Sequence, residues 1–266
     1  MDIATFLLRK ESSVQNIINE AKQKYSFAEN DVLVAVGSLA DGLGNIKSDL
    51  DLLLIKDDVQ AEIPGKSIAW KSGNCLVDME VVSIATVQQL SEKLVNWDAL
   101  EWDSTYESEL KINERKFLHR ILCGIYLDDE LKKSKVIKFT KKQLSKLKFH
   151  AARHLARTIQ VDMAGYKFSN DVKSLVYASH ELLGCAVDAI LAAEEYTNPT
   201  PKWRSRLLEL LPSYYIDFIN QANFTSIADA IWNAHHLPEL NEKAVHNKIN
   251  EISVLCRQLF FISECK

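Results

Sequence analysis

The chain has 266 residues, of which 47% are hydrophobic and 26% are charged, and its formal net charge is -4. This is ordinary globular composition, with enough apolar surface for one large domain or two modest ones. The acidic balance argues against binding of nucleic acid over the whole surface. The five cysteines have no paired short spacing, which argues against a disulfide framework or a CxxC zinc site. The N-terminus resembles neither a signal peptide nor a membrane span, so we expect a cytoplasmic protein with no membrane partner.

The first third of the chain predicts helix followed by strands. Apolar residues at helical spacing predict one amphipathic helix over residues 3–25, with Ser12 or Ser13 on its surface. Residues 38–43 fit a short helix closed by Gly44, because glycine adopts the left-handed C-terminal position easily. Short apolar and β-branched runs bounded by turn residues predict four strands, at residues 31–37, 50–55, 67–71 and 75–83.

Beyond residue 85 the strand pattern stops and the rest of the chain reads as helices. We therefore predict the α+β class, with a small mixed sheet and its helices in residues 1–114 and an all-helical bundle in residues 115–266. The lysine-rich stretch 132–148 is the candidate junction between the two halves. Its eight lysines also fit an anionic-substrate surface or, more simply, the solvated face of an amphipathic helix.

One segment carries the residues needed for chemistry on a nucleoside triphosphate. Gly37 ends the first predicted strand and Ser38 begins the short helix after it, where backbone N–H groups and a hydroxyl can contact phosphate. Asp49 and Asp51 then stand at the start of the second strand, and alternation along a strand places both carboxylates on one face. Such a pair suits shared Mg2+ coordination, whereas the structural alternative is a capped turn with an exposed acid.

A third carboxylate is expected from the neighbouring strand over residues 75–83. Asp78 and Glu80 share a face there by the same alternation, and either could bind metal or act as general base. We favour Asp78 and keep Glu80 as the second choice. The alternative is an edge strand whose polar face is in water.

The segment GSLADGLGNIKSDLDLLLI resembles the signature of the nucleotidyltransferase superfamily named after DNA polymerase beta. Within it, the chain is most similar to aminoglycoside (streptomycin/spectinomycin-type) adenylyltransferases, which also pair such a domain with a helical one. The motif-level resemblance covers roughly residues 30–85 and is architectural beyond them.

The resemblance implies that Gly37 and Ser38 contact the triphosphate, that Asp49 and Asp51 bind Mg2+, and that an acid on the next strand completes the site. One position departs from the pattern, because Asp41 stands where many members of the superfamily carry arginine. Phosphate neutralisation must then come from elsewhere. Some relatives use a lysine of the helical domain for this, and we pick Lys202, although it also fits a solvated helix start.

The resulting prediction is a Mg2+-dependent nucleotidyltransferase that moves AMP from ATP onto a hydroxyl of a small molecule, such as an antibiotic or biosynthetic intermediate. Asp98 to Glu109, an acidic run with aromatics, fits either a pocket for a cationic acceptor or an exposed connecting helix. The histidines form no metal set by spacing. Two alternatives remain: nucleotidylation of RNA or protein, and a non-catalytic nucleotide-binding relative. We expect a monomer or a homodimer.

Overall fold

The computed structural model divides the chain into two compact units, unit 1 over Met1–Leu144 and unit 2 over Ser145–Lys266. It describes residues 1–57, 66–99, 110–127, 133–198, 200–218, 224–236 and 242–264. The described part combines many helices with one five-stranded mixed sheet, so the predicted α+β class is confirmed. Most of the predicted acid–aromatic run, residues 100–109, lies outside the described residues.

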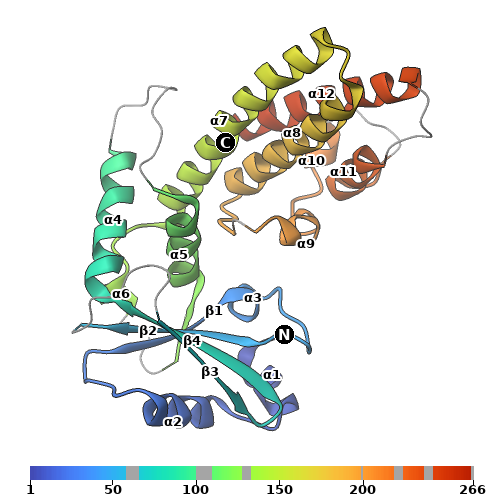
Figure 1. The fold of residues 1–266 in the computed structure, drawn as a ribbon. Helices are drawn as coiled ribbons and strands as arrows, with labels where there is room; N and C mark the ends of the chain where they lie inside the picture. Colours follow the sequence, from blue (N-terminus) through green and yellow to red (C-terminus); the bar gives the residue numbers. More distant parts are fainter. Residues whose placement is uncertain are drawn as a thin grey trace. The chain divides into compact units, whose positions relative to one another are not determined.

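Unit 1 is built on the sheet, whose strand order is β3-β4-β2-β1-β5 (Figure 1). β2 and β4 run parallel, and the other neighbouring strands run antiparallel. The four predicted strands all form. The elements of unit 1 in chain order are α1 (Ile3–Arg9), α2 (Val14–Lys24), β1 (Val32–Val36), α3 (Gly37–Ala40), β2 (Leu50–Lys56), β3 (Lys66–Ser72), β4 (Cys75–Ser83), α4 (Ile84–Asp98), α5 (Ile112–Cys123), β5 (Ile125–Tyr126) and α6 (Lys133–Val136), with α7 (Lys141–Phe168) crossing into unit 2.

The opening segment forms two helices, so the prediction of one continuous helix over residues 3–25 is wrong. The chain turns between α1 and α2, where Glu11 adopts a positive φ of 59°. Ser13 caps α2 by accepting a hydrogen bond from the Asn16 N–H at 3.1 Å. The sequence predicted Ser12 or Ser13 at the surface, and Ser13 is exposed. Ser12 is buried, and its hydroxyl lies 2.7 Å from that of Ser72 at the end of β3. A contact with a distant hairpin therefore interrupts the local helical pattern.

The two faces of the sheet are covered by different helices (Figure 1). One core cluster joins α1 and α2 to alternate residues of the strands, including Leu52 of β2 and Met79 of β4. Because side chains alternate between faces, Asp51 and Asp78 point to the other face, on the side of α4 and α5. The candidate acids are thus separated from the core packed under α1 and α2.

The first unit extends further along the chain than the sequence indicated. β5 pairs with β1 at the edge of the sheet, and α5 packs against β1, so the predicted boundary after residue 114 falls inside unit 1. The boundary of the compact units lies within the lysine-rich stretch 132–148. β5 has two residues, which is too short to leave a strand pattern in the sequence.

The described elements of unit 2 are helical. α8 is apolar and largely buried, and α12 packs along it. α8 is long and apolar enough to cross a membrane by length and composition, but 72% of its apolar window is buried, as in the core helix of a soluble protein. Besides α7, unit 2 contains α8 (Val172–Ala193), the 3-10 helix η2 (Pro201–Trp203), α9 (Arg204–Leu208), α10 (Tyr215–Phe218), α11 (Ile227–His235) and α12 (Glu242–Glu264).

Candidate functional site

Two of the predicted acids stand directly opposite each other in the sheet. Asp51 of β2 is the register partner of Asp78 of β4, and both side chains are partly buried. Neighbouring strands lie about 4.8 Å apart, and residues opposite each other project to the same face. The parallel pairing of β2 with β4 therefore places two acidic residues that are 27 positions apart in the sequence opposite each other on one face of the sheet.

The turn at Gly37 lies against the Asp51 carboxylate. On the other side of β2, Asp51 pairs in register with Val36, the residue before Gly37. Gly37 has φ +74°, and a Cβ atom added there would lie 2.2 Å from Asp51 Oδ2. Any side chain at this position would collide with the acid, so glycine allows the backbone of the turn and the carboxylate to share the space.

Ser38 follows in the short helix α3 and anchors the loop toward β2. Its carbonyl oxygen accepts hydrogen bonds from the N–H groups of Leu43 at 2.9 Å and Gly44 at 2.7 Å. Leu39 and Leu43 are buried beneath the loop. The predicted short helix closed near Gly44 thus corresponds to α3 and its following turn, which fixes the chain beside Asp51.

Asp49 differs from the other two acids in its position. It is exposed and lies one residue before β2, after a turn in which Asn45 N–H donates to the Ser48 hydroxyl at 3.0 Å. Strand alternation therefore does not fix the direction of its side chain as it does for Asp51. Asp49 directly precedes β2, whereas the strand register fixes the positions of Asp51 and Asp78 opposite each other.

The structure distinguishes Asp78 from Glu80. Glu80 lies opposite Leu53, two positions beyond the acid pair, and its Oε2 accepts a hydrogen bond from Arg120 Nη1 of α5 at 2.7 Å. The Asp78 Oδ1 atom accepts from the Ser67 hydroxyl at 2.7 Å. Asp78 is thus the acid opposite Asp51, while the carboxylate of Glu80 is hydrogen-bonded to the guanidinium of Arg120. Arg120 was not predicted from the sequence, because its partner Glu80 is 40 positions away.

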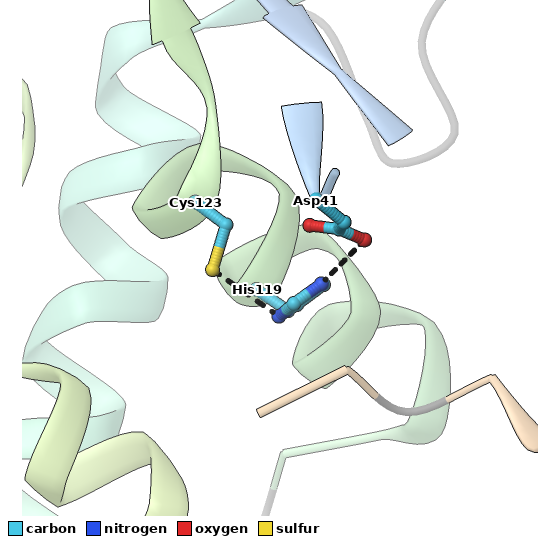
Figure 2. A group of neighbouring side chains, drawn as sticks. All are labelled: Asp41, His119 and Cys123. Carbon is cyan, nitrogen blue, oxygen red and sulfur yellow. Dashed lines mark hydrogen bonds and ion pairs between the residues drawn. The ribbon is translucent and has the colours of Figure 1, made fainter. Parts of the chain in front are cut away.

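Asp41, the residue that departs from the family pattern, contacts a buried histidine (Figure 2). Its Oδ2 atom lies 3.2 Å from Nε2 of His119, and the two side chains are 11% and 7% exposed. Burial lowers the pKa of His119, but hydrogen bonds and charge from Asp41 and Cys123 outweigh it and raise the pKa to about 9. The carboxylate of Asp41 therefore forms an ion pair with protonated His119.

Cys123 lies on the opposite side of the same imidazole ring. Its Sγ atom is 3.6 Å from His119 Nδ1, and ligand atoms of all three residues lie within 4.8 Å of one another. A metal ion binds only one nitrogen of a histidine, so one ion cannot replace both contacts in this arrangement. We interpret the cluster as a Cys–His–Asp hydrogen-bonded relay, which the histidine spacing in the sequence did not reveal.

Lys202, predicted to contact the triphosphate, lies in η2 of unit 2. It is exposed, and its ammonium stands over the Trp203 ring at 5.0 Å from the centroid. The predicted helix start at Pro201 is confirmed. Nearby, Arg204 forms two hydrogen bonds with Asp188, at 3.1 and 2.6 Å, and Lys148 Nζ lies 3.9 Å from the same carboxylate.

No family model matches the chain, and no curated protein matches it either.

Proposed function

We propose that this chain is a Mg2+-dependent nucleotidyltransferase of the polymerase-beta-like superfamily, similar to the aminoglycoside adenylyltransferases. The observation that carries the proposal is the placement of Asp51 opposite Asp78, with the Gly37 turn against the Asp51 carboxylate. A paired set of carboxylates beside a glycine turn suits a bound triphosphate and its divalent cation. This placement of Gly37, Asp51 and Asp78, which the sequence resemblance implies for the site, supports the proposal.

The donor set on this face suits a hard divalent cation. Asp51, Asp78 and Asp49 supply carboxylate oxygens, the ligands that Mg2+ prefers. Two partly buried carboxylates side by side repel each other unless a cation lies between them. When bound, Mg2+ would neutralise phosphate charge and align the reacting groups. Asp51 and Asp78 would hold it, with Asp49 reaching in from the start of β2.

Hydrogen bonds and positive charge for the triphosphate would come from groups of the chain itself. The Ser38 hydroxyl and the backbone N–H groups of the turn after β1 would donate hydrogen bonds to the triphosphate. Arg120 lies on the acid-bearing face through its contact with Glu80 and would supply positive charge that Asp41 does not.

The transfer requires a base near the acceptor. The acceptor hydroxyl gives its proton to a β4 carboxylate, Asp78 in our assignment, as its oxygen bonds to the α-phosphorus and pyrophosphate leaves. Glu80 is less suited, because its carboxylate is engaged with Arg120. We propose ATP as the donor, a small molecule as the hydroxyl acceptor and the cytoplasm as the location, and the net charge of -4 disfavours a polyanionic acceptor.

Thermal stability measured with each of the four nucleoside triphosphates, with and without Mg2+, tests this proposal. A ligand that binds only the folded state at about a hundredfold excess over Kd adds about 2.7 kcal/mol of stability. We expect a Mg2+-dependent shift that is lost in Asp51→Asn and in Asp78→Asn. Asp57→Asn is the matched control, since Asp57 is an exposed acid directly after β2. No shift with any triphosphate, or equal shifts in all variants, would contradict the proposal.

A further inference from the structure

The Cys123–His119–Asp41 relay is a chemical feature that nucleotidyl transfer does not use. His119 and Cys123 are four positions apart on α5, so they share one face of the helix. Asp41 comes from the turn after α3, 78 positions before His119. All three residues belong to unit 1.

We propose that Cys123 is a reactive thiolate held as an ion pair with protonated His119, and that it is a modification site for carbon electrophiles. The Sγ to Nδ1 distance of 3.6 Å is within the range of a sulfur hydrogen bond. The contact of Asp41 with Nε2 on the other side of the ring favours a proton on that nitrogen and stabilises the imidazolium. An adjacent imidazolium favours the thiolate over the thiol.

Burial separates Cys123 from the other described cysteines. Cys123 is partly exposed, whereas Cys75, Cys185 and Cys256 are buried. Burial raises the pKa of Cys75, raises that of Cys185 to about 11 and raises that of Cys256 to about 12. Among the four cysteines that the structure describes, a reagent that needs a thiolate should therefore reach and alkylate Cys123 first.

The other charged groups near α5 have partners of their own or lie elsewhere on the helix. Arg120 pairs with Glu80 of β4, and Lys93 of α4 lies 3.4 Å from Glu114. β1, which packs against α5, carries no charged residue. The further ionisable groups of α5 and its neighbours are Lys111 at the N-cap of α5, Arg115 and Lys116 of α5, Glu92 and Asp98 of α4, and Tyr126 of β5 with Lys133 over its ring.

The modification has a simple balance of atoms and electrons. With iodoacetamide, the thiolate sulfur attacks the methylene carbon, a C–S bond forms, the C–I bond breaks and iodide leaves. No proton moves in this step, because His119 already holds it. A neutral thiol must first lose its proton, so its rate follows the thiolate fraction.

Short iodoacetamide pulses between pH 5.5 and 9.5, with alkylation measured at each cysteine by peptide mass spectrometry, test the proposal. An ordinary thiol with a pKa near 8.5 is only about 0.3% thiolate at pH 6. We expect Cys123 to react at pH 6 at least tenfold faster than such a thiol. His119→Gln should remove the excess alkylation rate of Cys123 at pH 6 and move the pH of half-maximal rate toward or above 8.5. Asp41→Asn should move that pH in the same direction by a smaller amount.

Controls are present in every sample. Slow labelling of Cys75, Cys185 and Cys256 shows that each variant is folded, and Cys123→Ser assigns the adduct. His154→Gln, at an exposed position of α7, should leave the profile unchanged. The proposal is overturned if Cys123 follows the profile of an ordinary thiol in the wild type, if His119→Gln leaves its profile unchanged, or if EDTA changes its rate, which would indicate a metal-bound sulfur. None of these readouts depends on nucleotide transfer.

Discussion

Substitution of Gly37 by alanine tests the most specific contact in the site. Gly37 has φ +74°, and its added Cβ would lie 2.2 Å from Asp51 Oδ2. Gly42 has nearly the same φ, +73°, but a Cβ there meets nothing within 4 Å. The two glycines therefore separate the backbone effect from the collision with the acid.

The expected magnitudes follow from these two contributions. A left-handed conformation costs a non-glycine residue about 1–2 kcal/mol, and loss of glycine's freedom in the unfolded chain returns about 0.4–1 kcal/mol. Gly42→Ala should thus lower the free energy of unfolding by about 1 kcal/mol. Gly37→Ala carries an added overpacking cost of about 1–3 kcal/mol and displaces the Asp51 carboxylate.

Denaturant titration and the Mg2+-dependent triphosphate shift, measured on both variants, provide the assay. Gly37→Ala should be the less stable protein and should lose the triphosphate shift, whereas Gly42→Ala should keep it. In an Asp51→Ala background the added penalty of Gly37→Ala should disappear, because the colliding atom is gone. Equal effects of the two substitutions on stability and on triphosphate binding would contradict the predicted collision between the added Cβ at position 37 and the Asp51 carboxylate.

Two further predictions concern buried charges. Asp31 and Lys56 form a buried ion pair at 2.8 Å, so Lys56→Met should lower the free energy of unfolding by about 3–5 kcal/mol. Adding Asp31→Asn should restore part of that free energy, because the unpaired buried carboxylate is then gone. If denaturant titration shows no such recovery, the loss in Lys56→Met does not come from the broken ion pair. Burial lowers the pKa of Lys148 from 10.5 to about 8, so between pH 8 and 10.5 the unfolded state holds a proton that the folded state has lost. The free energy of unfolding of the wild type relative to that of Lys148→Met should therefore rise with pH in this window, by at most about 1.4 kcal/mol per pH unit. A difference that does not change with pH would contradict the lowered pKa of Lys148.

Local patterns in the sequence were enough to predict four of the five sheet strands, β1 to β4, and the position of the glycine turn. β2 and β4 are short apolar runs with acids at fixed places, so strand alternation alone assigns Asp51 and Asp78 to faces. What alternation could not supply was the register between the strands. That register places Asp78, rather than Glu80, opposite Asp51.

The features missed from the sequence all depend on contacts between distant positions. The break between α1 and α2 is held by the β3–β4 hairpin, where Asn74 N–H donates to the Lys10 carbonyl oxygen at 2.7 Å. The partner of Asp41 is 78 positions away and that of Glu80 is 40 positions away. No local periodicity carries such information, and β5 is too short to show any.

The proposed metal and nucleotide site can be tested by a crystal structure with Mg2+ and a non-hydrolysable ATP analogue. We predict an ion bound at about 2.0–2.1 Å to carboxylate oxygens of both Asp51 and Asp78, with the triphosphate against the turn at Gly37 and Ser38. An ion bound away from this pair, or a nucleotide seated elsewhere, would contradict this prediction.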